Sequence, residues 1–464
     1  MAAPTVQRGT ATPASRLTLL IRRLTNSLVR PVLAVLLALL VGGIIIMITA
    51  TGSLLDRLST VLAAYHYLVQ GSFGSLQSIS YTLVVATALI FAGLSVSIAY
   101  RAGLFNIGTA GQLTVGAITA GAIGLRFTGW PGWLLVPTMI IASALAGAIY
   151  GGIVGLLKAW RGAHEVVTCI MLNWIAFYFA DYLVDGPFKV QNLSEQSLPL
   201  PPQATLPSVA NFYNQTLGTF LPRIATPTVY TVDMSIFLAL IALVIYWFVT
   251  SRTTFGYELR VIGQNVRAAR YAGIPVQRNI IYAMALGGAF AGLAGSLRLM
   301  GQAPNQLIAT SFALDTTGFD AIGVALLGRT TAVGVLISSL LFGGLTQAAP
   351  NMQLFAHIPA DLIYIVQALV LFSITIEFLP SIQRRLPGLF GRSSGKTPLV
   401  PNVIGETTPI IPDETKMEIT ELGTNGKGDR RIERDEQSGD EIAATPMPIK
   451  DEPAATPRPI KQEE

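Results

Sequence analysis

Residues 252–278 read RTTFGYELRVIGQNVRAARYAGIPVQR, a polar stretch between two long apolar segments. It carries five arginines and one glutamate, a balance typical of a loop on the cytoplasmic side of a membrane. Asn265 is suited to cap a helix, Gly273 to end it in a left-handed turn, and Pro275 prevents its continuation. The stretch therefore predicts a helix of two turns over residues 266–272.

Two turns of helix are not stable in water alone, so this helix needs other contacts to stay ordered. One interpretation is an ordinary solvated loop between two membrane helices. The other is a coupling helix that seats on a motor subunit, which could approach closely over the small side chains of Ala268, Ala269 and Ala272. The residues alone leave both interpretations open.

The composition of the whole chain is that of a membrane protein. Hydrophobic residues make up 51% of the 464 residues and charged residues only 12%, outside the usual range of soluble domains. The apolar runs are continuous, which favours membrane helices over the alternating strands of a β-barrel. The excess positive charge lies in loops beside these runs and does not indicate nucleic-acid binding. The single cysteine, Cys169, excludes an internal disulfide and a cysteine-based metal cluster.

We expect an all-α, polytopic helix bundle with ten spans. The eighth span is too short to cross a membrane at about 1.5 Å per residue, so it should be a broken or re-entrant helix lined by protein. The spans cover residues 31–50, 76–99, 104–125, 133–157, 166–184, 234–250, 279–300, 319–327, 332–348 and 362–378.

Basic residues orient this bundle. With the N-terminal segment in the cytoplasm, Arg101, Arg329 and the 252–278 loop also lie inside, which satisfies the positive-inside rule and places both termini in the cytoplasm. The expected organisation is a cytoplasmic segment at 1–30, a membrane domain at 31–385 with an extracytoplasmic loop at 185–233, and a disordered cytoplasmic tail, rich in Pro, Thr, Gly and charge, at 386–464.

Two glycine-rich segments carry polar residues into predicted spans: YRAGLFNIGTAGQLTVG at 100–116 and GFDAIGVALLGR at 318–329. Placing Asp at membrane depth costs about 2.5–3.5 kcal/mol on insertion scales, so polar side chains persist there only when they face a cavity or another helix. We expect broken helices and a polar translocation pathway here; the alternative is that Asn106 and Asp320 cap helix starts. The pathway candidates are Phe105, Asn106, Gly108, Thr109, Gln112, Asn173, Phe319, Asp320 and Gly323.

The two similar motifs suggest an internal repeat, in which spans two to five correspond to spans seven to ten. Such symmetry is typical of transporters. Glycine also recurs every four residues, at Gly147, Gly151 and Gly155 and again at Gly288 and Gly292, which predicts close helix packing.

No catalytic or metal-ligating set is found in the sequence. The three histidines lie far apart and have no ligand spacing. The segment GRSSGKT at 391–397 has one residue too few between its glycines for a phosphate loop, and no strand precedes it. We therefore expect a transport subunit and not an enzyme.

The segments YRAGLFNIGTAGQ, TTFGYELRVIGQNVRAARYAGI and GFDAIGVALLGR resemble the permease subunits of ABC importers in the branched-chain amino acid and simple-sugar superfamily. The nearest resemblance is to bacterial nucleoside permeases, over residues 76–379. It implies a multi-pass protein of the bacterial inner membrane that pairs with a second, related permease. It also implies a cytoplasmic ATPase, which holds ATP and Mg²⁺, and an extracytoplasmic lipoprotein that delivers the substrate.

In this family a loop like 252–278 contacts the ATPase, and where the family commonly has proline after the asparagine, this chain has Val266. The residues that match this loop are Gly256, Glu258, Leu259, Arg260, Gly263, Asn265, Ala268, Ala269, Arg270, Ala272 and Gly273.

The expected function is to form the translocation pathway for nucleosides or simple sugars, with branched-chain amino acids as the alternative substrate. An ion-coupled secondary transporter would instead need ionisable residues deep in its spans, for which Asp320 and Asp181 are the best candidates. A channel or a membrane scaffold would need no docking helix.

Overall fold

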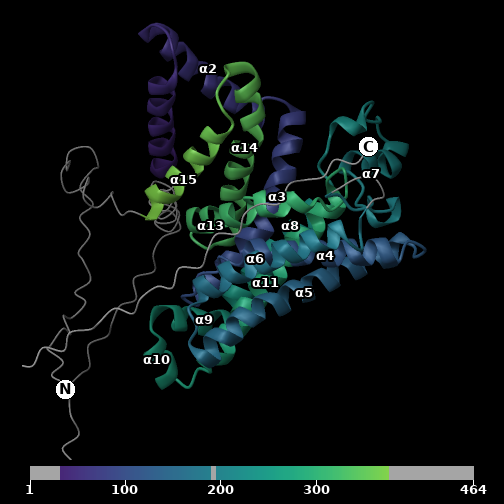
Figure 1. Cartoon of the computed structure of the whole chain (residues 1–464), viewed down its shortest axis with the longest axis vertical. Helices are drawn as coiled ribbons and strands as arrows, with labels where there is room; N and C mark the ends of the chain where they lie inside the picture. The colour runs from purple at the N-terminus through teal and green to yellow at the C-terminus, as the bar shows by residue number, and fades with distance from the viewer. Residues whose placement is uncertain (1–31, 190–194, 376–464) are drawn as a thin grey trace, which may run out of the picture. The chain divides into compact units, whose positions relative to one another are not determined.

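The computed structural model describes residues 32–189 and 195–375. In these ranges the chain folds into α-helices joined by loops and short 3₁₀ turns, and it forms isolated β-bridges but no strand (Figure 1). The all-α prediction is confirmed. The predicted segments 1–30 and 386–464 lie outside the described residues.

Each of the ten predicted spans contains a helix. Seven helices of the described ranges are long and apolar enough to cross a membrane, and α4, α13 and α15 are not among these seven. The ten helices are Val32–Thr49, α3 (Leu76–Arg101), α4 (Thr109–Arg126), α5 (Gly132–Arg161), α6 (Glu165–Asp185), α8 (Ser235–Arg252), α11 (Val276–Gly301), α13 (Thr317–Leu327), α14 (Ala332–Ala356) and α15 (Asp361–Thr375).

Further helices lie between these spans. α2 (Leu54–Phe73) begins with a capping box between Ser53 and Asp56 and packs against α14. The sequence analysis did not predict α2, because charged and polar residues interrupt its apolar pattern. The polar loop forms α9 (Thr254–Gln264) and α10 (Val266–Tyr271). The short helices α7 (Val209–Gln215) and α12 (Ala309–Leu314) lie between α6 and α8 and between α11 and α13, respectively.

The glycines at four-residue spacing hold α5 and α11 together. A Cβ atom added to Gly147 would lie 2.9 Å from the Cα of Gly292, and one added to Gly151 would lie 3.0 Å from the Cα of Gly288. The first distance is shorter than real Cβ contacts and the second is shorter than nearly all of them, so glycine allows the two backbones to come this close. The predicted close packing is confirmed.

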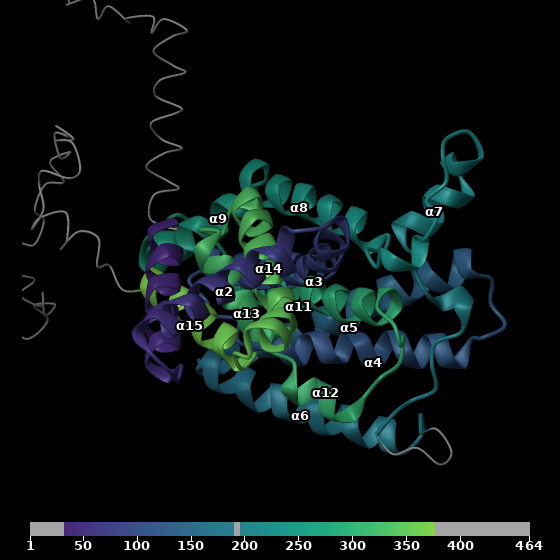
Figure 2. The same ribbon diagram turned by 90° about the horizontal axis from the view of Figure 1, so that it is seen from above.

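The first helix of each predicted repeat packs on helices of the other repeat. α3 begins the first repeat and packs on α13 and α14 of the second, while α11 begins the second and packs on α4 and α5 of the first. α3 and α11 also contact each other, and α4, α5 and α6 lie side by side (Figure 2). This exchange is the arrangement that an internal repeat with equivalent helices would produce.

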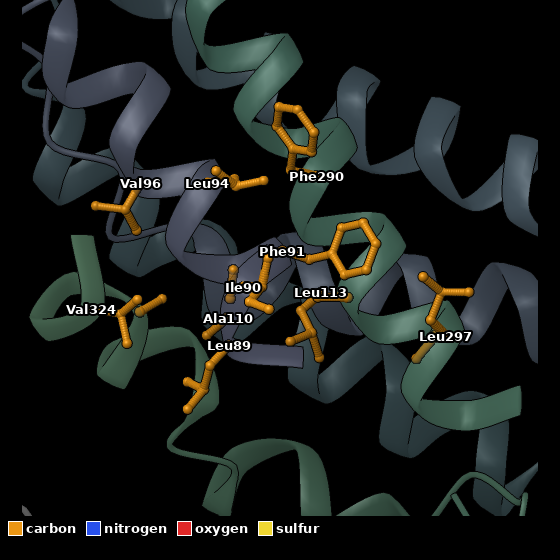
Figure 3. Packing of buried hydrophobic residues seen from close by; sticks show 14 of the residues in the cluster. Leu89, Ile90, Phe91, Leu94, Val96, Ala110, Leu113, Phe290, Leu297 and Val324 are labelled. Atoms are coloured by element: carbon orange, nitrogen blue, oxygen red, sulfur yellow. The ribbon is translucent and has the colours of Figure 1, made fainter. Parts of the chain in front are cut away.

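Apolar side chains fill the region where α3, α4, α11 and α13 meet. Figure 3 shows Phe91 of α3, Leu113 of α4, Phe290 and Leu297 of α11, and Val324 of α13 in one buried cluster. Each of these side chains is at most 5% exposed. The two repeats therefore share one core.

Exchange of Gly151 for alanine tests the glycine contact. The new Cβ would meet the backbone of α11, whereas at the neighbouring Gly152 it would lie 3.7 Å from the Cβ of Ala285, an ordinary contact. Helix propensity alone favours alanine by about 1 kcal/mol at both positions. Overpacking costs about 1–3 kcal/mol, so we expect Gly151→Ala to lower the Tm of the purified protein in detergent and Gly152→Ala to maintain or raise it. Equal shifts in both variants would contradict the account.

Candidate functional site

The polar loop forms a helical hairpin. Asn265 ends α9 and caps α10: its Oδ1 accepts hydrogen bonds from the backbone N–H groups of Arg267 and Ala268, at 2.9 and 3.1 Å. Gly273 follows α10 with a φ angle of +74°, in the left-handed region. The predicted helix with its cap and its stop is confirmed. α9 was not predicted, although Thr253, whose hydroxyl accepts from the N–H of Gly256, was a possible capping signal.

One side of this hairpin is fixed to the membrane domain. Ala269 is 0% exposed and packs with Ile262 and Val276, so it does not belong to an outward face with Ala268 and Ala272, as the sequence had suggested. The reason is the helical period, because residues one apart point about 100° away from each other. The inward contacts show how a helix of this length stays ordered without a partner.

Two further contacts attach α9 to the bundle. The Nδ2 of Asn279, in α11, donates a hydrogen bond of 2.7 Å to Glu258 Oε2. Gly263 lies against the backbone of Arg101 and Gly103 at the end of α3. The residues of the predicted coupling set therefore divide into two groups. Gly256, Glu258, Leu259, Gly263 and Ala269 touch the bundle, whereas Arg260, Asn265, Ala268, Arg270, Ala272 and Gly273 are exposed on the hairpin.

Among the pathway candidates, Asn106 and Gln112 form a reciprocal amide pair. Asn106 Nδ2 donates to Gln112 Oε1 at 3.0 Å, and Gln112 Nε2 donates to Asn106 Oδ1 at 3.1 Å. Asn106 Nδ2 also donates to the hydroxyl of Ser95, in α3, at 3.0 Å. The N-cap of α4 is Gly108, which provides no side-chain cap. The alternative that Asn106 caps this helix is therefore wrong.

Asn173, in α6, binds backbone groups just before α4 and in its first turn. Its Oδ1 accepts from the N–H of Gly111 at 2.9 Å, and its Nδ2 donates to the carbonyl of Ile107 at 3.0 Å. The hydroxyl of Thr109 donates to the carbonyl of Asn106 at 3.1 Å. Backbone groups freed by a helix break must find partners inside a membrane protein. These side chains supply the partners.

The second glycine motif lies against the first. A Cβ atom on Gly318 would lie 2.5 Å from the Cα of Ala110, so α13 and α4 begin against each other. α13 has 11 residues, which confirms that the eighth predicted span is too short to cross. Arg298 forms an ion pair with Asp315 and donates to the hydroxyl of Thr317 at 3.2 Å, which fixes the start of α13.

The other candidates of this motif do not join the amide pair. Asp320 accepts a hydrogen bond of 2.8 Å from the hydroxyl of Thr316, and α13 has no side-chain cap, so Asp320 does not cap it. Phe319 is 46% exposed. A Cβ on Gly323 would lie 2.7 Å from the ring of Phe342, so this glycine allows α14 to pack closely. Phe105 is half-buried beside Tyr100. A role of these residues in translocation stays a prediction.

The extracytoplasmic loop of the prediction packs over the connection between α11 and α13. Backbone N–H groups of Ser197, Leu200 and Leu206 donate to the carbonyls of Leu307, Asn305 and Met300, respectively, at 2.8–2.9 Å. At the end of this loop, Asp233 is 3% exposed and accepts from the N–H of Ser235. Burial raises the pKa of the Asp233 carboxyl. The loop is thus hydrogen-bonded to the end of α11 and to the segment that follows it, at the end of the bundle away from α10 (Figure 1).

Residues 78–375 match the family model described as the permease component of the branched-chain amino acid transport system. The chain belongs to this permease family. It is 35% identical to the guanosine ABC transporter permease protein NupP of Bacillus subtilis, over 77% of this chain and 96% of the relative. It is 32% identical to the nucleoside ABC transporter permease protein NupB of Lactococcus lactis, over 76% and 92%. No solved structure matches.

A third relative of this permease, the glucose ABC transporter permease protein TsgB13 of Haloferax volcanii, is 34% identical over 75% of this chain and 87% of the relative. The relatives are thus transport subunits, which agrees with the expectation of a subunit without catalytic residues.

The amide pair of the permease can be tested by a double-mutant cycle. Asn106→Leu leaves the buried Gln112 amide without its partner, at a cost of about 1–3 kcal/mol. Gln112→Leu removes the donor to Asn106 Oδ1, while Asn106 Nδ2 keeps its bond to Ser95. In the double variant both amides are absent. We therefore expect its loss of Tm in detergent to be clearly smaller than the sum of the losses in the two single variants. Gln264→Leu, at an exposed position of α9, serves as the control. Strict additivity would contradict the reciprocal pair.

Proposed function

We propose that this permease forms the transmembrane pathway of an ABC importer for nucleosides or simple sugars. The observation that carries the proposal is the α9–α10 hairpin, which is attached to α3 and α11 on one side and offers capped, exposed residues of α10 on the other. A hairpin with this geometry can be displaced by a bound partner and can transmit this displacement to the membrane helices. The names of the relatives favour nucleosides and sugars as substrates.

The proposal assigns ATP and Mg²⁺ to a separate cytoplasmic ATPase, which docks on the exposed face of α10. A second, related permease would complete the pathway, and an extracytoplasmic lipoprotein would deliver the substrate. The relatives support these partners, because they are named as permease proteins of ABC transporters. Branched-chain amino acids remain the alternative substrate, as the description of the family suggests.

We place the hairpin on the cytoplasmic side of a bacterial inner membrane. Three arginines lie over aromatic rings, at the C-terminal ends of α5 and α8 and at the N-terminal end of α11. These pairs are Arg161 on Trp160, Arg252 on Trp247 and Arg278 on Tyr282, at 4.6, 5.3 and 5.1 Å from the ring centroids. Aromatic residues are enriched at membrane–water interfaces, and arginine is enriched in the loops on the cytoplasmic side. Together these pairs support a cytoplasmic position for α9 and α10.

In the proposed cycle, ATP binding moves the two halves of the ATPase together and displaces α10. Because Ala269 and Glu258 attach the hairpin to α11, and Gly263 lies against the end of α3, both helices move with it. These two helices begin the two repeats and pack on each other's partners, so their displacement changes the angle between the repeats. The bundle would then open to the opposite side of the membrane.

The direct test is uptake of labelled guanosine, ribose and leucine by cells with and without the gene. We expect ATP-dependent uptake of guanosine or ribose that is lost when the gene is deleted. Uptake of leucine alone would select the alternative substrate. Transport by the purified permease without any ATPase would contradict the proposal.

The matched variants for this assay are Ala268→Trp and Gln70→Trp, which both place a large side chain on an exposed position. Ala268 lies on the outer face of α10, where the bulk would hold the ATPase away, so we expect uptake to fall more than about tenfold, the effect of 1.4 kcal/mol. Gln70 lies on α2, and its exchange should leave uptake unchanged. Immunoblots of the membrane fraction exclude an effect on the amount of protein.

A further inference from the structure

Arg101, in the last turn of α3, joins three separate elements of the bundle. Its Nε donates to the hydroxyl of Tyr246, in α8, at 3.0 Å and to the carbonyl of Thr330 at 3.2 Å, and its Nη2 donates to the same carbonyl at 2.7 Å. The hydroxyl of Tyr246 also donates to this carbonyl at 2.7 Å. The turn between α13 and α14 is thus tied to α3 and α8 through one oxygen atom.

This turn has an unfavourable backbone conformation. Arg329 and Thr330 have φ angles of 50° and 51°, in the left-handed region. For a residue other than glycine this conformation costs about 1–2 kcal/mol of free energy. Such conformations persist when the surrounding structure holds them in place. The hydrogen bonds to the Thr330 carbonyl provide that hold. Tyr246 is 0% exposed, and the Arg101 guanidinium lies 5.5 Å from the centroid of its ring.

The backbone of the same arginine contacts the hairpin. Gly263 of α9 lies against the carbonyl of Arg101 and the N–H of Gly103. Gly103 has a φ angle of +73°, and a Cβ atom on it would lie 3.3 Å from the Cα of Gly263. The end of α3 therefore touches α9 with its backbone and holds the α13–α14 turn with the side chain of Arg101.

We propose that Arg101 is the positioning residue that transmits displacement of the α9–α10 hairpin to the re-entrant helix α13. The inference rests on the proposed function. The planar guanidinium reaches the Tyr246 hydroxyl and the Thr330 carbonyl at the same time, with the hydrogen atoms in a fixed fork. A lysine ammonium is a point charge on a flexible chain, so it cannot reproduce this rigid double contact. Without the contact, α3 still packs on α13 and α14 through apolar side chains, but no fixed hydrogen bond couples the end of α3, where α9 touches it, to the turn that ends α13.

The test uses the complete transporter, reconstituted with its ATPase and binding protein, and measures substrate imported per ATP hydrolysed. The variants are Arg101→Lys, which keeps the charge, and Tyr246→Phe, which keeps the ring and removes the hydroxyl. We expect both to keep ATP hydrolysis within about twofold of the wild type, while the transport ratio falls at least about tenfold for Arg101→Lys and less for Tyr246→Phe. Arg126→Lys, at the opposite end of α4, is the control and should keep the ratio.

A purely structural role of Arg101 predicts a different result, because loss of folded protein lowers transport and hydrolysis in parallel and leaves their ratio unchanged. An unchanged ratio in both variants would overturn this inference and leave the proposed function intact. If Arg101→Lys does not assemble, Tyr246→Phe alone decides by the same criterion. A wild-type complex that imports nothing with ATP would instead overturn the proposed function, and the inference with it.

Discussion

The architecture depends on how the protein supplies hydrogen-bond partners to the backbone N–H and C=O groups where a helix is interrupted. A membrane offers no water to the N–H and C=O groups that a break leaves unpaired. Between α3 and α4 these groups are bound by Asn173 and Thr109. The side chains of Asn106 and Gln112 bind each other, and Asn106 also binds Ser95. This polar network lets α4 begin inside the bundle, directly against the start of α13. The contact between the two repeats follows from it.

The same break follows Arg101, which lies where the repeats and the α9–α10 hairpin meet. Glycine makes three close helix contacts possible. Gly318 lets α13 begin against α4, Gly263 lets α9 approach α3, and Gly288 lets α11 lie against α5. In each case the neighbour is backbone, which cannot move aside as a flexible side chain does. Backbone contacts of this kind transmit displacement stiffly, because they leave no rotamer to absorb it. The proposed coupling route consists of the packing of α10 on α9, the backbone contact of Gly263 in α9 with the end of α3, and the hydrogen bonds from Arg101 to Thr330.

The sequence predicted those features that depend on neighbours along the chain. The helices within the ten spans follow from apolar runs, and α10 follows from Asn265 and Gly273, which act within four residues. α2 was missed because Asp56, Arg57, His66 and Gln70 interrupt an apolar face that only contact with α14 explains.

The partners of the polar residues could not be predicted, because they come together only in the fold. Thr330, which Arg101 binds, lies 229 residues away in the chain, and nothing in the motif around Arg101 indicates this contact. The same holds for the inward direction of Ala269, which depends on Ile262 and Val276. The most direct measurement of the central claim is the distance between spin labels in the assembled transporter, before and after a non-hydrolysable ATP analogue binds. With labels at Arg267 and Val333, we expect an unchanged distance in the wild type, because α10 and the start of α14 move together, and a clear shift in the Arg101→Lys variant. A shift in the wild type, or none in the variant, would contradict the central claim.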